Sequence, residues 1–115
     1  MTALAQPLRD PYPVSADAEI AKLFTALERN LASLPTDGDR VVYVNIQIDA
    51  WEGREREMLR WAQQHPHEAR NRFAPWTAFS VAIVRARLGA MHAALVDKIK
   101  AARAEAIAAL PEECL

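Results

Sequence analysis

Three histidines and one cysteine are the side chains of this sequence that most often bind transition metals. His65 and His67 flank Pro66 and could begin a zinc site, which needs about four nitrogen or sulfur ligands. The second pair of ligands is missing, because His92 stands alone on a predicted helix and Cys114 lies next to the C-terminus. Two histidines around a proline in a loop are more often simply solvated. We therefore predict no metal site and no cofactor.

Catalytic groups are equally sparse. No nucleophile has a plausible base beside it in the sequence, and the three glycines form no phosphate-binding loop. Acidic residues and arginines alternate from Glu52 to Glu57, which is typical of an exposed helix face held by local ion pairs. The sequence predicts that the protein is not an enzyme. A small-ligand or enzyme module that uses a pocket under Trp76 and Phe79 remains an alternative.

The net charge of −1 does not indicate nucleic-acid binding, but the charges are unevenly distributed. Residues 1–39 carry three basic and six acidic side chains, residues 40–87 carry eight and five, and residues 88–115 carry three and four. Every basic residue of the middle segment is an arginine, whose planar fork suits phosphate oxygens and guanine edges. The simpler interpretation is that these arginines line solvated helix faces.

The clearest local pattern is an alternation of side-chain polarity over residues 41–48. Apolar side chains stand at every second position, at Val42, Val44, Ile46 and Ile48. This period of two, rich in β-branched residues, predicts a strand with one apolar face.

A helix is predicted directly after this strand. Asp49 is a suitable N-cap, and Glu52 stands where a capping box places an acid. The helix is expected to end at Gln64, because Pro66 follows. Trp51 is expected to pack under the strand, and Trp61 to be half-buried or to lie at an interface.

A lone strand needs partners for its backbone N–H and C=O groups, so either a second strand exists or another copy of the chain supplies it. The segment VVYVNIQIDAWEGREREMLRWAQ resembles the ribbon-helix-helix family of DNA-binding proteins in its alternating strand, its Asp at the turn and its helix ending in Leu-x-x-Ala. The resemblance extends over residues 40–88. In that family two strands from two subunits form an antiparallel ribbon, and two helices follow each strand.

The resemblance implies which residues would contact DNA. The outward strand side chains of the family enter the major groove, where Asn and Gln can form paired hydrogen bonds with adenine. Phosphate contacts would fall near the start of the second helix. The implied residues are Arg40, Tyr43, Asn45, Gln47, Arg54, Arg72 and Thr77. The alternative is that Tyr43, Asn45 and Gln47 only form the solvated side of a sheet. Trp76 also lies near the start of the second helix, but core packing explains this residue better than DNA contact does.

Two further helices flank this segment. An amphipathic helix is predicted from a cap at Ser15 or Asp17 to Pro35, with apolar residues at Ile20, Leu23, Phe24, Leu27, Leu31 and Leu34. A long helix is predicted from Pro75 to Pro111, roughly 35 residues or about 50 Å.

Both faces of that long helix are apolar as far as Leu88, which predicts deep burial. Its far half exceeds what a domain of this size needs and is expected to pack on a partner subunit. The connection over residues 65–74 is longer than the family has, and a short helix is predicted from Glu68 to Phe73.

The sequence thus predicts an extended arm over residues 1–14 and one mainly α domain over residues 15–115, which forms a homodimer through the strand at 41–48. The expected function is that of a small dimeric DNA-binding protein, a transcriptional regulator that contacts the major groove with a two-stranded ribbon. The alternative is a helical protein–protein interaction module, an adaptor or an inhibitor that binds no DNA. A cytoplasmic location without membrane contact is expected, since no secretory signal or uncharged apolar run of about 18 residues is seen.

Overall fold

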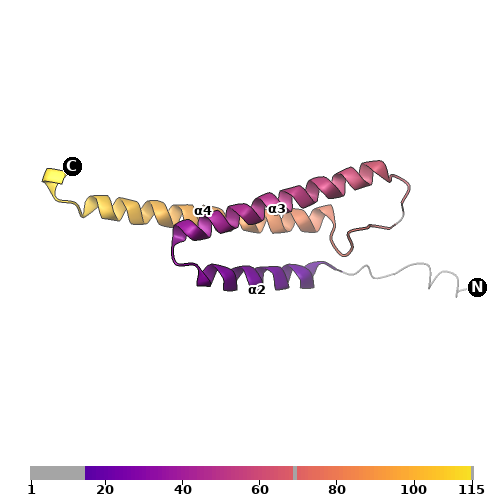
Figure 1. Ribbon diagram of the computed structural model, residues 1–115, viewed down its shortest axis with the longest axis horizontal. Helices are drawn as coiled ribbons and strands as arrows, with labels where there is room; N and C mark the ends of the chain where they lie inside the picture. Colours follow the sequence, from indigo (N-terminus) through magenta and orange to yellow (C-terminus); the bar gives the residue numbers. More distant parts are fainter. Residues whose placement is uncertain (1–14, 69, 115) are drawn as a thin grey trace, which may run out of the picture.

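The computed structural model describes residues 15–68 and 70–114, which form three consecutive antiparallel helices (Figure 1). Helix α2 spans Asp17–Ser33, α3 spans Asp37–Gln64, α4 spans Ala78–Ala108, and a short 3₁₀ turn, η1, covers Glu112–Cys114. The described part of the chain contains no β-strand. The mainly α class and the long final helix are confirmed. The arm predicted over residues 1–14 lies outside the described residues.

The strand predicted over residues 41–48 is wrong, because these residues lie inside helix α3. Thr36 caps this helix, and its hydroxyl accepts a hydrogen bond from the Asp39 N–H at 3.1 Å. The predicted start at Asp49 is therefore also wrong, whereas the end at Gln64 is confirmed. Because the strand is absent, the two-stranded ribbon expected from the family resemblance cannot form from this segment.

A helical repeat explains why the alternating segment folds as a helix. Val44, Trp51 and Met58 are spaced by seven residues and are all buried, so one apolar seam continues well beyond the end of the predicted strand. Val42 and Ile46, which a strand would have buried beside Val44, are each 58% exposed. A helix also satisfies its backbone groups without a second strand. The seven-residue apolar repeat of α3 therefore decides the structure of residues 41–48, which on their own fit a strand as well as a helix.

Helix α2 forms over the predicted segment, but its N-cap is Ala16, not Ser15 or Asp17. Ile20, Phe24 and Leu27 are buried along one side. The Ser15 hydroxyl accepts a hydrogen bond from the Asp17 N–H at 3.1 Å at the start of the helix. On the opposing helix, the Arg87 guanidinium lies 3.8 Å from the centre of the Phe24 ring, a cation–π contact that joins α2 to α4.

Helices α3 and α4 form the centre of the fold. On α4, Val81, Val84 and Leu88 are completely buried and pack in the same apolar cluster as the α3 seam. Met91 and Leu95 continue this line of α4 at the spacing of three and four residues that is typical of coiled-coil packing. We call this line the filled seam of α4.

Helix α4 begins later than predicted. Its first residue is Ala78, not Pro75. Thr77 is the N-cap, and Thr77 and Ser80 form a reciprocal capping box. No helix occurs among the described residues of the connection between α3 and α4, so the short helix predicted from Glu68 to Phe73 is wrong.

The C-terminal half of α4 extends past the turn between α2 and α3 and away from the other helices (Figure 1). Every described residue from Lys100 onward is exposed. The expected deep burial of the first half holds for one face, where Val81, Val84 and Leu88 are completely buried, but not for the other, where Phe79 is 77% exposed. Helix α4 therefore carries far more apolar surface than its own chain covers.

Candidate interaction surface

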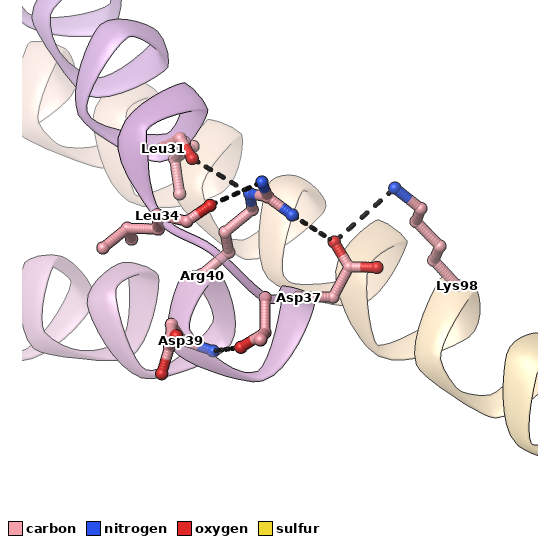
Figure 2. Close-up of polar contacts among 7 residues, drawn as sticks. Leu31, Leu34, Asp37, Asp39, Arg40 and Lys98 are labelled. Carbon is pink, nitrogen blue, oxygen red and sulfur yellow. Dashed lines mark hydrogen bonds and ion pairs between the residues drawn. The ribbon is translucent and has the colours of Figure 1, made fainter.

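Arg40, predicted to flank the DNA-contacting residues, instead closes the turn between α2 and α3 (Figure 2). Its Nε donates to the Leu31 carbonyl at 2.9 Å and its Nη2 donates to the Leu34 carbonyl at 2.7 Å. Its Nη1 donates to Asp37 Oδ1 at 2.7 Å. The Leu34 carbonyl lies past the end of α2 and gains its partner in this way, whereas the Leu31 carbonyl also accepts from the Leu34 N–H at 3.1 Å. Three of the five N–H donors of the guanidinium are therefore engaged within the fold.

The Asp37 carboxylate at this turn receives a second cation, since Lys98 Nζ of α4 lies 3.5 Å from the same Oδ1 atom (Figure 2). The hydrogen bond from Arg40, and to a smaller extent the charge of Lys98, lower the pKa of Asp37 below its ordinary value. The three side chains thus tie α4 to the turn where its free half begins.

The predicted row of base-contacting residues does not exist. Successive residues of a helix are rotated by about 100°, so Tyr43 and Gln47, four residues apart, share one face of α3, whereas Asn45 points to the opposite side. The Tyr43 hydroxyl accepts a hydrogen bond from Asn30 Nδ2 of α2 at 2.9 Å. Asn45 is exposed and Gln47 is half-buried.

The three predicted phosphate contacts lie toward the other end of α3 and support the connection to α4. The Arg54 guanidinium lies 4.9 Å from the Trp51 ring centre and 5.9 Å from that of Trp76. Arg72 lies 5.5 Å from the Phe73 ring centre, and Thr77 caps α4. Arg40 and Arg54 are separated by about 21 Å along the helix, so the predicted DNA-contacting residues form no single site.

An open cavity of about 390 Å³ lies where α3 ends. Its wall includes Trp61, which stacks on His65 with ring centres 4.8 Å apart and meets the Phe73 ring edge-on at 6.0 Å. Trp61 is half-buried, as one of the two predictions for it had stated. His65 Nδ1 lies 2.9 Å from the Trp61 carbonyl oxygen, and among the described residues no three metal-binding side chains gather here or elsewhere.

The largest unpartnered feature is a second line of residues on α4, which we call the open stripe. Its members repeat at intervals of three and four residues, as those of the filled seam do, but only Val96 among them is even half-buried. They are Phe79, Ala82, Ala86, Gly89, Ala93, Val96, Lys100, Arg103 and Ile107, followed by Leu110 just after the helix. Three of the six most exposed large apolar residues of the described chain, Phe79, Ile107 and Leu110, lie on it.

A shallow groove of about 410 Å³ runs beside this stripe between α3 and α4. Ile48 and Glu52 of α3 form one wall, and Ala82, Ala86 and Gly89 form the floor on α4. Arg85 also lines the groove and donates from Nη1 to Glu55 Oε1 at 2.7 Å. Glu52 is half-buried and makes no ion pair among the described residues. The groove therefore presents an uncompensated carboxylate beside small side chains.

Helix α4 is also long and apolar enough to cross a membrane by length and composition alone, a test that a core helix of a soluble protein can pass. Only 22% of its most apolar 18-residue window is buried, however, which is low for a core helix. Arg85 and Arg87 interrupt this part of the helix, and both contact other helices of the fold. The exposed apolar surface of α4 therefore lies largely on the open stripe.

The sequence analysis missed the open stripe, although a count at intervals of three and four residues along α4 would have found it.

Comparison of the chain with protein-family models, curated proteins and solved structures found no match. The resemblance to the ribbon-helix-helix family stays a prediction for function, and its strand is wrong.

Proposed function

We propose that this protein is a helical protein–protein interaction module, which binds a helix of its partner along the open stripe of α4. The observation that carries the proposal is the regular spacing of the stripe residues from Phe79 to Ile107 at coiled-coil intervals, all of them exposed except the half-buried Val96. A helix with apolar residues at these intervals normally buries them against another helix. In the isolated chain, α2 and α3 cover only the filled seam.

The energetic gain from covering the stripe is large. Complete burial of a side chain of the size of Phe or Leu contributes about 1.5–3 kcal/mol, and Phe79, Ile107 and Leu110 are all at least 45% exposed. The alanines and Gly89 between them allow a second helix to approach closely. A partner helix with larger apolar residues at the matching positions would fill this surface.

DNA binding receives less support. Arg40, Tyr43 and Thr77 are engaged in contacts within the fold, and the net charge of the chain is −1. DNA binding by the remaining arginines stays a prediction. Phosphate-driven binding would retard random duplex DNA at about 50 mM salt and release it at high salt. The interaction module is expected to leave the duplex unretarded at both.

Site-specific photo-crosslinking tests the proposal. A photoreactive phenylalanine analogue at position 86, in the open stripe, is expected to form an adduct with a protein in the expressing cell. The same group at position 101 is the control, because Ala101 is equally exposed on α4 but lies off the stripe. Adducts from position 86 alone support the proposal, whereas absence of adducts from position 86 contradicts it.

A vesicle assay separates a protein partner from a lipid surface. The module is expected to remain in the supernatant when sedimented with anionic phospholipid vesicles. Cosedimentation that Ala86→Glu abolishes and Ala101→Glu does not would show that the stripe binds lipid, and would contradict the proposed function.

A further inference from the structure

We propose that the helix bound on the open stripe is α4 of a second copy of this chain, laid antiparallel about a two-fold axis between Ala93 and Val96. This inference rests on the proposed function and specifies the partner. A two-fold interface requires one surface to complement itself. The size and charge of the side chains along the stripe meet this requirement.

The sizes of the side chains match in the antiparallel direction. Positions equally far from the midpoint face each other, so Ala93 meets Val96 of the second copy and Ala82 meets Ile107 of the second copy. Phe79 meets Leu110 at each end of the contact. Every small residue of the stripe is thereby opposed by a longer side chain, which fills the space between two closely spaced helices.

The charges match in the same register. Gly89 faces Lys100 of the second copy, and Ala86 faces Arg103 of the second copy. Glu52 lines the groove beside both small residues and has no ion-pair partner in the described part of its own chain. Lys100 and Arg103 are exposed and likewise form no ion pair there. The antiparallel pair brings the two unpaired cations to the unpaired carboxylate.

The parallel arrangement fails on the same residues. It would oppose Lys100 to Lys100 and Arg103 to Arg103, and like charges in direct opposition are unfavourable. It would also place Gly89 against Gly89 and leave a gap between the helices. In addition, the three-helix bodies of both copies would occupy the same end of the α4 pair.

The antiparallel pair also explains the free half of α4. The helix extends beyond its own α2 and α3 (Figure 1), and in the pair this half lies along the groove of the other copy. From Phe79 to Leu110 the stripe contains roughly four heptads, which is enough for a stable coiled coil. Each three-helix body then gains a fourth helix from its partner.

Charge reversal and sedimentation equilibrium test the proposal. The full chain is expected to have the mass of a dimer at micromolar concentration. Glu52→Lys and Lys100→Glu should each raise the dimer dissociation constant roughly tenfold, because both place like charges in the groove. The variant that carries both changes should return to within about threefold of the parent. Within one chain Glu52 lines the groove beside Gly89, and Gly89 is 11 residues or about 16 Å from Lys100 along α4. The recovery must therefore come from contact between copies.

An exposed alanine provides the matched pair of variants. Ala86→Arg should make the chain monomeric while its far-ultraviolet circular dichroism stays helical, because the new side chain opposes Arg103 of the second copy. Ala101→Arg should leave the dimer intact. Two results would contradict the second copy as the partner. One is a parent chain that is monomeric at about 100 μM, and the other is a doubly charge-reversed variant whose dimer dissociation constant is as high as those of the single variants. If position 86 still crosslinks to another protein in that case, the proposed function stands. If it crosslinks to nothing, both fail.

Discussion

The two lines of residues along α4 differ in size and in what covers them. The filled seam carries Val81, Val84 and Leu88, large residues that α2 and α3 bury completely. The open stripe carries alanines and a glycine beside the same stretch, with Phe79 at one end. Large residues form a core within one chain, whereas small residues allow another helix to come close. The difference indicates that the filled seam stabilises the fold of the chain and that the open stripe binds a partner helix.

A charge introduced into the filled seam should have the largest effect on folding of all the changes that test this comparison. Val84→Asp places a carboxylate in a completely buried position within the apolar cluster, which costs several kcal/mol. We expect loss of helical circular dichroism at 25 °C. The equivalent change in the open stripe, Ala86→Asp, should retain the helical signal. Equal loss of structure in both variants would contradict the distinction between the two lines.

The Arg40 contacts at the turn between α2 and α3 give the next largest effect. Arg40→Gln removes hydrogen bonds to two carbonyl groups and to Asp37, and should lower the free energy of unfolding in urea by about 1–3 kcal/mol. Arg29→Gln is the control, because Arg29 is exposed on α2 and makes no ion pair within the described part of the chain. Arg40→Lys should restore little, since an ammonium group cannot reach all three acceptors. A stability equal to that of the control would refute this role.

Acid should weaken the same turn. The pKa of Asp37 is lowered in the folded chain by Arg40 and Lys98. Its stabilising contribution is therefore present above the unfolded pKa and is lost as the pH falls through the lower, folded pKa. We expect the melting temperature of the parent to fall more steeply below about pH 4 than that of Asp37→Asn. Parallel curves for the two proteins would show that this carboxylate does not contribute.

The smallest expected effect on folding belongs to Phe79. Because its side chain is 77% exposed, Phe79→Ala should change the stability of the single chain by no more than about 0.5 kcal/mol. The same change should weaken association measurably, since it removes one of the large side chains of the open stripe. Measurements at nanomolar and at 100 μM concentration would separate the two effects. A large loss of stability at both concentrations would place Phe79 in the core instead.

The sequence predicted α2 and the long α4 well, because each has an apolar repeat that runs for several turns and ends at a proline. It failed over residues 41–48, where eight residues fit a strand and a helix equally and the deciding signal lay further on, at Trp51 and Met58. The role of Arg40 could not be predicted, since its acceptors are backbone carbonyls placed by the turn. The open stripe was present in the sequence, but its exposure depends on where α2 and α3 lie.

Hydrogen exchange of the free half of α4 tests most directly whether its open stripe is covered. A helical segment of about ten residues without packing is marginally stable in water, so in a single chain the amides of residues 98–108 should exchange rapidly. We predict that their protection rises with protein concentration and that Ala86→Arg, but not Ala101→Arg, abolishes the rise. Rapid exchange at every concentration up to 1 mM, with and without the cellular components that crosslink to position 86, would contradict the account.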